Sequence, residues 1–176
     1  NYESDSDPID EDNFQLLITK IRQIYTIKKI EDAQSIIDTI RNLIQQDPLM
    51  ANALIENDFN SLFNFLVEMN TNIFYCSLYD LLSELFLKYE GDFDIFVSQN
   101  VLIFLNILSD ENSHIFISNL KCIRNLLAKN KAYKHFFIEN GGYFKLLSYE
   151  IYENILEDKV ILIFDIISMI IEVQNE

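Results

Sequence analysis

The chain has 176 residues, of which 49% are hydrophobic and 23% charged, and its formal net charge is −15. This length and composition suit one domain, or one continuous stack of repeats, with a sizeable core. Nucleic acid and an acidic membrane surface are poor partners, because both require a basic protein surface. A basic peptide or the basic face of another protein is the electrostatic complement.

Turn-forming residues are scarce, with only 3 Gly and 2 Pro in the whole chain. β-Sandwiches and α/β enzymes need more turns than this, so the composition favours an all-α fold of long helices joined by short loops. The first residues are polar and acidic, and the apolar positions from Phe14 onward recur with a helical period. We therefore predict a disordered acidic lead over residues 1–12 and a helical repeat domain over residues 13–176.

The clearest amphipathic helix is predicted over residues 31–46, whose apolar residues follow three- and four-residue spacing. Pro48 ends this helix, because proline has no amide hydrogen to donate. Two short helices are then predicted, over residues 49–56 and 59–69. The first helix of the domain is expected over residues 13–28, as a cap or as the end of a preceding unit.

An internal repeat organises the chain. The tetrapeptide Ile-Arg-Asn-Leu at 40–43 recurs at 123–126, and the tripeptide Ile-Glu-Asn at 55–57 recurs at 138–140, both 83 residues later. Two matches in one register indicate repeats, and this offset corresponds to two units of about 42 residues each. A middle unit and a fourth long helix over 159–173 continue the pattern. Each unit is predicted to hold a long helix, a short helix ending near an Asn, and a second short helix.

Tight corners are expected after the first short helix of each unit, at Asn57, Asn100 and Asn140-Gly141, because Asn and Gly tolerate left-handed backbone angles. Three helices in about 42 residues, repeated, is the armadillo pattern. From residue 31 onward the chain resembles armadillo-type helical-repeat proteins. Residues 138–147 are similar to the family's corner between its first and second helices, and residues 123–126 to the Asn-containing end of its third helix.

The resemblance implies a right-handed armadillo-type α-solenoid of about three to four repeats. Its third helices would line a concave groove, in which an Asn on each helix holds the backbone of an extended peptide. The matching positions here are Asn42, Glu84, Asn125 and Ser168. With the polar residues one and two turns earlier, the expected partner-binding residues are Ser35, Asp38, Asn42, Ser77, Asp80, Glu84, Ser118, Lys121, Asn125 and Ser168.

The helical spacing supports this set independently. Ser35, Asp38 and Asn42 fall on one helix face, away from the apolar stripe of their helix. An amide side chain can pair with both the donor and the acceptor of a peptide group, and a carboxylate prefers a basic side chain. The chain contains no Trp. Import receptors of the importin-alpha type place a Trp one turn before each Asn, so we do not expect nuclear localisation signals to be recognised by their mechanism.

Signatures of catalysis are missing from the sequence. The 2 His residues, His114 and His135, belong to no metal-binding motif, and Gly91 is too isolated for a phosphate-binding loop. Cys76 and Cys122 form neither a CxxC pair nor zinc spacing. We predict no enzyme activity, no cofactor and no metal site. Two buried free thiols suit a reducing compartment, cytoplasmic or alternatively nuclear.

The sequence thus predicts a non-catalytic scaffold or adaptor that binds a protein or a peptide. The bound segment is expected to be either basic or an amphipathic helix. Two alternatives remain. Residues 134–147 resemble the corner of armadillo nucleotide-exchange factors of heat-shock chaperones, and residues 122–137 are loosely similar to the regulatory armadillo domain of diaphanous-type formins. The last helix is strongly apolar, whereas a solenoid normally ends in a polar cap. We expect association through this helix, either with a further repeat or with a second copy.

Overall fold

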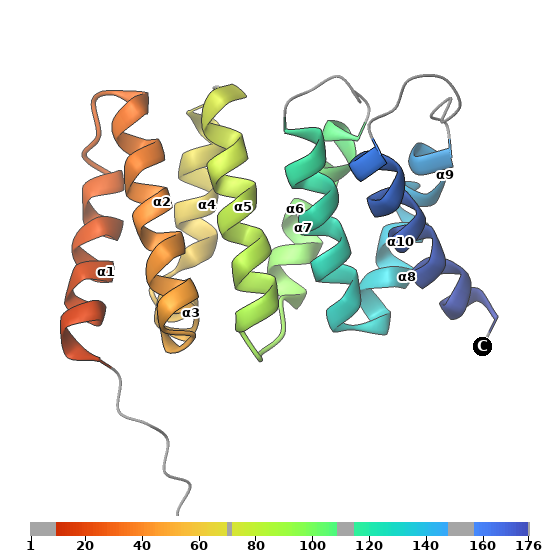
Figure 1. The fold of residues 1–176 in the computed structure, drawn as a ribbon, viewed down its shortest axis with the longest axis horizontal. Helices are drawn as coiled ribbons and strands as arrows, with labels where there is room; N and C mark the ends of the chain where they lie inside the picture. The colour runs from red at the N-terminus through yellow and green to blue at the C-terminus, as the bar shows by residue number, and fades with distance from the viewer. Residues whose placement is uncertain (1–9, 70–71, 109–114, 148–156, 176) are drawn as a thin grey trace, which may run out of the picture. The chain divides into compact units, whose positions relative to one another are not determined.

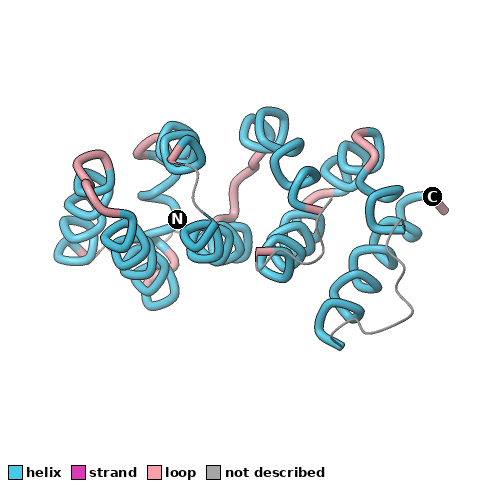
Figure 2. The backbone as a smooth tube through the Cα atoms, turned by 90° about the horizontal axis from the view of Figure 1, so that it is seen from above, coloured by secondary structure: helices cyan, strands magenta, loops and turns pink. Residues whose placement is uncertain are grey.

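The computed structural model describes residues 10–69, 72–108, 115–147 and 157–175, and these residues form helices and no strand (Figures 1 and 2). The all-α prediction is therefore confirmed for the described part of the chain. The chain divides into two units, Asn1–Asn70 and Thr71–Glu176. In chain order the helices are α1 (Glu11–Ile24), α2 (Ile30–Gln46), α3 (Leu49–Glu56), α4 (Phe59–Glu68), α5 (Asn72–Lys88), α6 (Asp94–Ile107), α7 (Phe116–Lys129), α8 (Lys131–Glu139), α9 (Gly142–Leu147) and α10 (Glu157–Gln174).

In the first unit, α1 packs against α2 and α3, α2 packs against α3, and α3 packs against α4. The apolar stripe predicted on α2 is confirmed, because all six of its residues are buried: Ala33, Ile36, Ile37, Ile40, Leu43 and Ile44. Leu17 and Ile24 of α1 are also fully buried. The core of this unit is thus built by amphipathic helices that bury one face each.

Helix α1 begins earlier than the sequence predicted. The side chain of Asp10 accepts hydrogen bonds from the amides of Asp12 and Asn13 at 3.0 and 3.3 Å. An aspartate that caps the first turn in this way fixes the start of a helix, here at Glu11. The end of the predicted acidic lead is therefore helical, and residues 1–9 of that lead lie outside the described residues.

In the second unit, α5 packs against α7, and α7 packs against α6, α8 and α10 (Figure 1). Helix α10 also contacts α8 and α9. The rings of Tyr79, Phe86, Phe93, Phe96 and Phe104 form a buried aromatic cluster, with edge-on neighbours 4.8–6.4 Å apart between ring centroids. This is the geometry in which aromatic side chains attract one another beyond simple burial.

Helices α3, α6 and α8 start in the same way. Asp47, Asp92 and Asn130 each accept a hydrogen bond from the backbone amide two residues later, at 3.0, 3.2 and 2.8 Å. These contacts satisfy an amide at the beginning of α3, α6 and α8, which helical hydrogen bonds leave unpaired. The same hydrogen bond therefore stands at the start of three helices of the described residues.

The same three helices share a second hydrogen bond. The side-chain amides of Asn57, Asn100 and Asn140 each donate to the backbone carbonyl four residues earlier, at 2.7, 2.9 and 2.8 Å. After the first and the last of these, the chain turns through a left-handed residue, Asp58 with φ 59° and Gly141 with φ 83°. Asn57 and Asn140 thus stand at the ends of α3 and α8, and the residue after each of them makes the corner.

The corner predicted at Asn100 is wrong. Helix α6 runs through this residue without interruption, and Asn100 is buried at 2% exposure. Its successor is Val101, where the other two repeats have Asp58 and Gly141. A β-branched side chain strongly disfavours a positive φ, so the helix continues. The two short helices expected in the middle repeat are therefore one helix of 14 residues.

Candidate partner-binding face

The three long helices of the second unit carry seven of the ten predicted site residues. Because α7 contacts both α5 and α10, these helices lie side by side (Figure 1). We call their polar side the long-helix face, which comprises Asp80, Ser83, Glu84, Ser118, Lys121, Arg124, Asn125, Asp165 and Ser168. Ser77 also lies on α5, but it is buried, with 5% of its surface exposed.

A row of polar side chains crosses this face from α5 to α10. The Asn125 amide donates to the hydroxyl of Ser83 at 2.7 Å and to its carbonyl at 3.4 Å. The Arg124 Nε donates to the side-chain oxygen of Asn125 at 3.4 Å. On its other side Arg124 pairs with Asp165 of α10, with 3.8 Å between nitrogen and oxygen. Four residues thereby connect the polar sides of three helices.

Asn125 therefore differs from the free peptide-holding amide that the resemblance implies. It is only 7% exposed, and both of its polar groups have partners within the protein. A buried amide satisfied in this way clamps two helices together. Asn119, about one and a half turns earlier on α7, also bridges to α6, because its side-chain nitrogen donates to the backbone carbonyl of Phe104 at 3.0 Å. Its side-chain oxygen is buried and has no hydrogen-bond partner among the described residues.

The accessible part of the face carries mixed charge. Asp80, Glu84 and Ser118 are half-buried, whereas Lys121 and Ser168 are exposed. An acidic strip on α5 therefore lies beside a basic residue on α7. Such a surface can offer carboxylates to a basic side chain and an ammonium group to an acidic one.

The remaining predicted residues form a row of their own on α2 in the first unit. Ser35 and Asn42 are exposed, and Asp38 is half-buried and pairs with Arg41 at 3.7 Å within the same helix. Asn42 occupies the same place in its tetrapeptide as Asn125, so identical sequence has led to different exposure. The difference arises because Asn125 has Ser83 of a neighbouring long helix as its partner.

The sequence patterns did not indicate a role for Ser83, Arg124 or Asp165. Arg124 could have been found, because it lies inside the repeated tetrapeptide beside Asn125. Ser83 and Asp165 belong to no repeated motif. Their roles depend on which residues of neighbouring helices stand opposite each other, and a periodic pattern within one helix does not contain this information.

Cys76 lies on α5 and Cys122 on α7, and neither forms a disulfide bond; Cys122 is buried and Cys76 is half-buried. Burial, and secondly the nearby negative charge of Asp80, raises the pKa of both thiols, and that of Cys122 lies well above its usual value. A raised pKa keeps a thiol protonated and poorly nucleophilic. In the described residues no group of His, Cys, Asp and Glu side chains is arranged to hold a metal ion.

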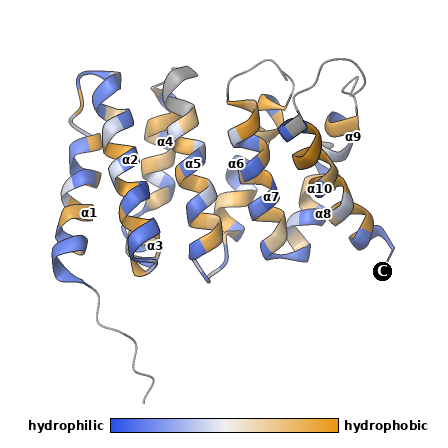
Figure 3. Ribbon diagram, in the orientation of Figure 1, coloured by the Kyte–Doolittle hydropathy of each residue, from blue (hydrophilic) through white to orange (hydrophobic). Residues whose placement is uncertain are grey.

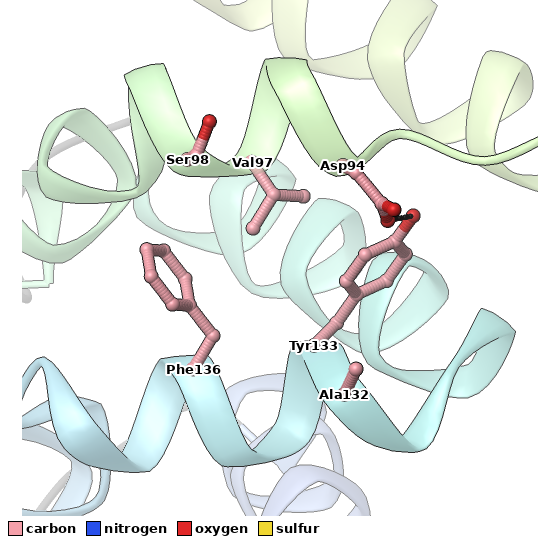
Figure 4. Close-up of a pocket in the computed structure, with 6 residues that line it drawn as sticks. All are labelled: Asp94, Val97, Ser98, Ala132, Tyr133 and Phe136. Atoms are coloured by element: carbon pink, nitrogen blue, oxygen red, sulfur yellow. Dashed lines mark hydrogen bonds between the residues drawn. The ribbon is translucent and has the colours of Figure 1, made fainter.

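A pocket of about 200 Å³ opens between α6 and α8 (Figure 4). It is lined by Asp94, Val97, Ser98, Ala132, Tyr133 and Phe136. The Tyr133 hydroxyl donates to Asp94 at 2.9 Å and accepts the backbone amide of Phe93 at 2.6 Å. Two aromatic rings beside a carboxylate form surroundings that suit a cationic side chain. Sequence analysis did not predict this pocket, which lies between two helices nearly forty residues apart.

The hydroxyl of Tyr133 gives a first testable prediction. Burial is the main cause that raises its pKa to about 12, from 10.0 in water. The folded state therefore favours the neutral hydroxyl of Tyr133. The contribution of this hydroxyl to stability is complete below pH 10 and is lost as the pH rises towards 12. We expect Tyr133→Phe to lower the free energy of unfolding at neutral pH by about 1–2 kcal/mol, because the buried amide of Phe93 loses its acceptor.

The measurement is urea unfolding of the intact chain and of Tyr133→Phe at neutral and alkaline pH. The variant should lose less stability than the intact chain between neutral pH and about pH 12, because it lacks this titrating group. Tyr143→Phe is the matched control, since Tyr143 is half-buried on the neighbouring helix α9. Equal stability of all three proteins at neutral pH would contradict the assigned hydrogen bonds.

Comparison of the chain with protein-family models, with curated proteins and with solved structures gave no match. The helices of the described residues include none long and apolar enough to cross a membrane.

Proposed function

We propose that the chain is a non-catalytic armadillo-type module that binds a segment of a partner protein along the long-helix face. The order of helices supports the repeat assignment, because α2 is followed by the shorter helices α3 and α4, and α7 is followed by the shorter helices α8 and α9. The Asx caps and the Asn side-chain bonds at matching positions support it further. Modules of this type present the long helix of every repeat on one binding surface.

The observation that carries the proposal is the polar row Ser83–Asn125–Arg124–Asp165. It links α5, α7 and α10 through side-chain hydrogen bonds and one part-exposed ion pair. Asp80, Glu84, Lys121 and Ser168 stand on these same helices with part or all of their surface accessible. Preorganised charged groups on rigid helices bind with less loss of conformational entropy than groups on mobile loops.

The charges on the long-helix face indicate which side chains the partner carries. Asp80 and Glu84 would face basic side chains, and Lys121 would face a carboxylate or a chain of backbone carbonyls. The net charge of −15 favours approach of a basic segment from a distance. We infer that the bound segment is extended and predominantly basic, with an acidic residue beside its basic ones.

A phage-displayed library of random peptides, selected on the intact chain, tests this proposal. We expect enrichment of basic peptides whose affinity falls with added salt. Asp80→Asn combined with Glu84→Gln should weaken binding about tenfold, or about 1.4 kcal/mol. Glu139→Gln is the matched control, because Glu139 is an exposed acid on α8 outside the face.

Two results would refute the proposal. One is a selection that yields no peptide binding above background. The other is a set of peptides whose affinity is the same for the double variant, the control and the intact chain. Circular dichroism of the double variant would show that its helices are retained, since both replaced side chains are part-exposed and isosteric with their replacements.

A further inference from the structure

The outward side of α10 is apolar where a surface helix is normally polar. Ile161, Phe164 and Ile171 are 51%, 55% and 45% exposed, and Ser168 between them is also exposed. The opposite side of the helix is buried against the rest of the second unit, through Leu162, Ile163, Ile166, Ile170 and Val173. Figure 3 shows the extended hydrophobic stretch of this helix. Helix α10 thus has two apolar faces, and one of them is uncovered.

The spacing of the uncovered residues is informative. Ile161, Phe164, Ser168 and Ile171 are separated by three, four and three residues. This is the alternation of the inner positions of a coiled coil, which place one narrow stripe against a neighbouring helix. We call these four residues the α10 seam. A stripe this narrow fits a single helix better than a broad protein surface.

Acidic residues follow one edge of the α10 seam. Asp158, Asp165 and Glu172 are all exposed and are spaced seven residues apart. Asp165 and Glu172 directly follow Phe164 and Ile171 of the seam, and Asp158 lies one heptad before Asp165. In a coiled coil this flanking position faces the edge of the partner helix and selects it by charge. Asp165 lies 3.8 Å from Arg124, yet its side chain remains 48% exposed and can also face a partner.

We propose that the α10 seam binds one amphipathic helix of another protein, with apolar residues in its own inner positions and Lys or Arg beside them. A second copy of this chain fits less well, because each copy carries a net charge of −15 and the same acidic edge. This inference goes beyond the proposed function, because the residues that bind here differ from Asp80, Glu84 and Lys121. Ser168 and, at the acidic edge, Asp165 belong to both surfaces.

The test uses the intact chain and a synthetic three-heptad helix with Ile and Leu at its inner positions and Lys at both flanking positions. Fluorescence anisotropy measures binding of this helix, of a helix with Glu at the flanking positions, and of a scrambled peptide with the composition of the Lys helix. Phe164→Ser combined with Ile171→Ser removes the apolar contact from the α10 seam. Leu102→Ser is the matched control, because Leu102 is 61% exposed on α6.

We expect the Lys helix to bind and the other two peptides to fail. The double variant should bind the Lys helix about tenfold more weakly, whereas Leu102→Ser should bind it unchanged. Failure of the Lys helix to bind, or equal binding by the double variant, would overturn the proposal. So would sedimentation of the intact chain as a dimer that the double variant abolishes. Asp80 and Glu84, on which the phage-displayed peptide selection depends, are unchanged in these variants. A failure of the α10 seam can therefore be distinguished from a failure of the proposed function.

Discussion

Replacing Phe86 with alanine should lower the free energy of unfolding of the second unit by about 3–5 kcal/mol. Phe86 is 1% exposed, and its ring lies 4.8 Å from that of Phe93 and 5.9 Å from that of Phe96 between centroids. Alanine would leave a cavity and would remove two edge-on aromatic contacts, each worth about 0.5–1.5 kcal/mol beyond burial. The cavity cannot close easily, because its walls are rings that pack against other helices.

Leu87 provides the matched control for this change. It is the next residue on α5 and is 60% exposed, so Leu87→Ala should change the free energy of unfolding by less than about 1 kcal/mol. Urea unfolding followed by circular dichroism measures both variants, and tyrosine fluorescence provides a second signal. If the two variants lost similar stability, the aromatic cluster would not be the core of this unit.

The second large effect is expected at the α8–α9 corner, where Gly142→Ala should lower the free energy of unfolding by about 2 kcal/mol. A methyl group on Gly142 would lie 2.4 Å from the ring of Phe137, far inside van der Waals contact. Phe137 is 3% exposed, so its ring has no open space into which to move. The variant must shift either the ring or the start of α9.

The neighbouring residue should respond differently. Gly141 has nothing within 4 Å of the same methyl position, but its φ is +83°. Gly141→Asn should therefore cost less than about 1 kcal/mol, because Asn tolerates this conformation. Asp58 already occupies the matching corner with a positive φ of 59°. Thermal unfolding of Gly142→Ala and Gly141→Asn shows which variant loses more stability. A larger loss of stability in Gly141→Asn than in Gly142→Ala would contradict the corner geometry.

The sequence predicted those parts of the fold that depend on residues close together in the chain. The stripe on α2 was found because its six residues share one helix face, and the repeat was found because two short motifs recur in one register. The middle corner was missed because the prediction considered Asn100 and neglected Val101, whose β-branched side chain keeps α6 continuous.

The candidate site was less predictable. The pattern correctly placed Asp80, Glu84 and Lys121 on long helices with accessible surface, but it gave no sign that Asn125 would be buried against Ser83. Exposure of one polar residue depends on the side chain that a neighbouring helix presents to it. The α6–α8 pocket was missed for the same reason, since Asp94 and Tyr133 meet only after the helices pack.

The central claim is that a partner segment lies along the long-helix face. Hydrogen–deuterium exchange of the intact chain, with and without the strongest peptide from the library selection, tests it most directly. Binding there should slow amide exchange in α5 around Asp80 and Glu84 and in α7 around Lys121, while exchange in α8 stays unchanged. Slower exchange confined to α8 and α9, with α5 and α7 unaffected, would contradict the claim and would place the partner at the α6–α8 pocket or the corner instead.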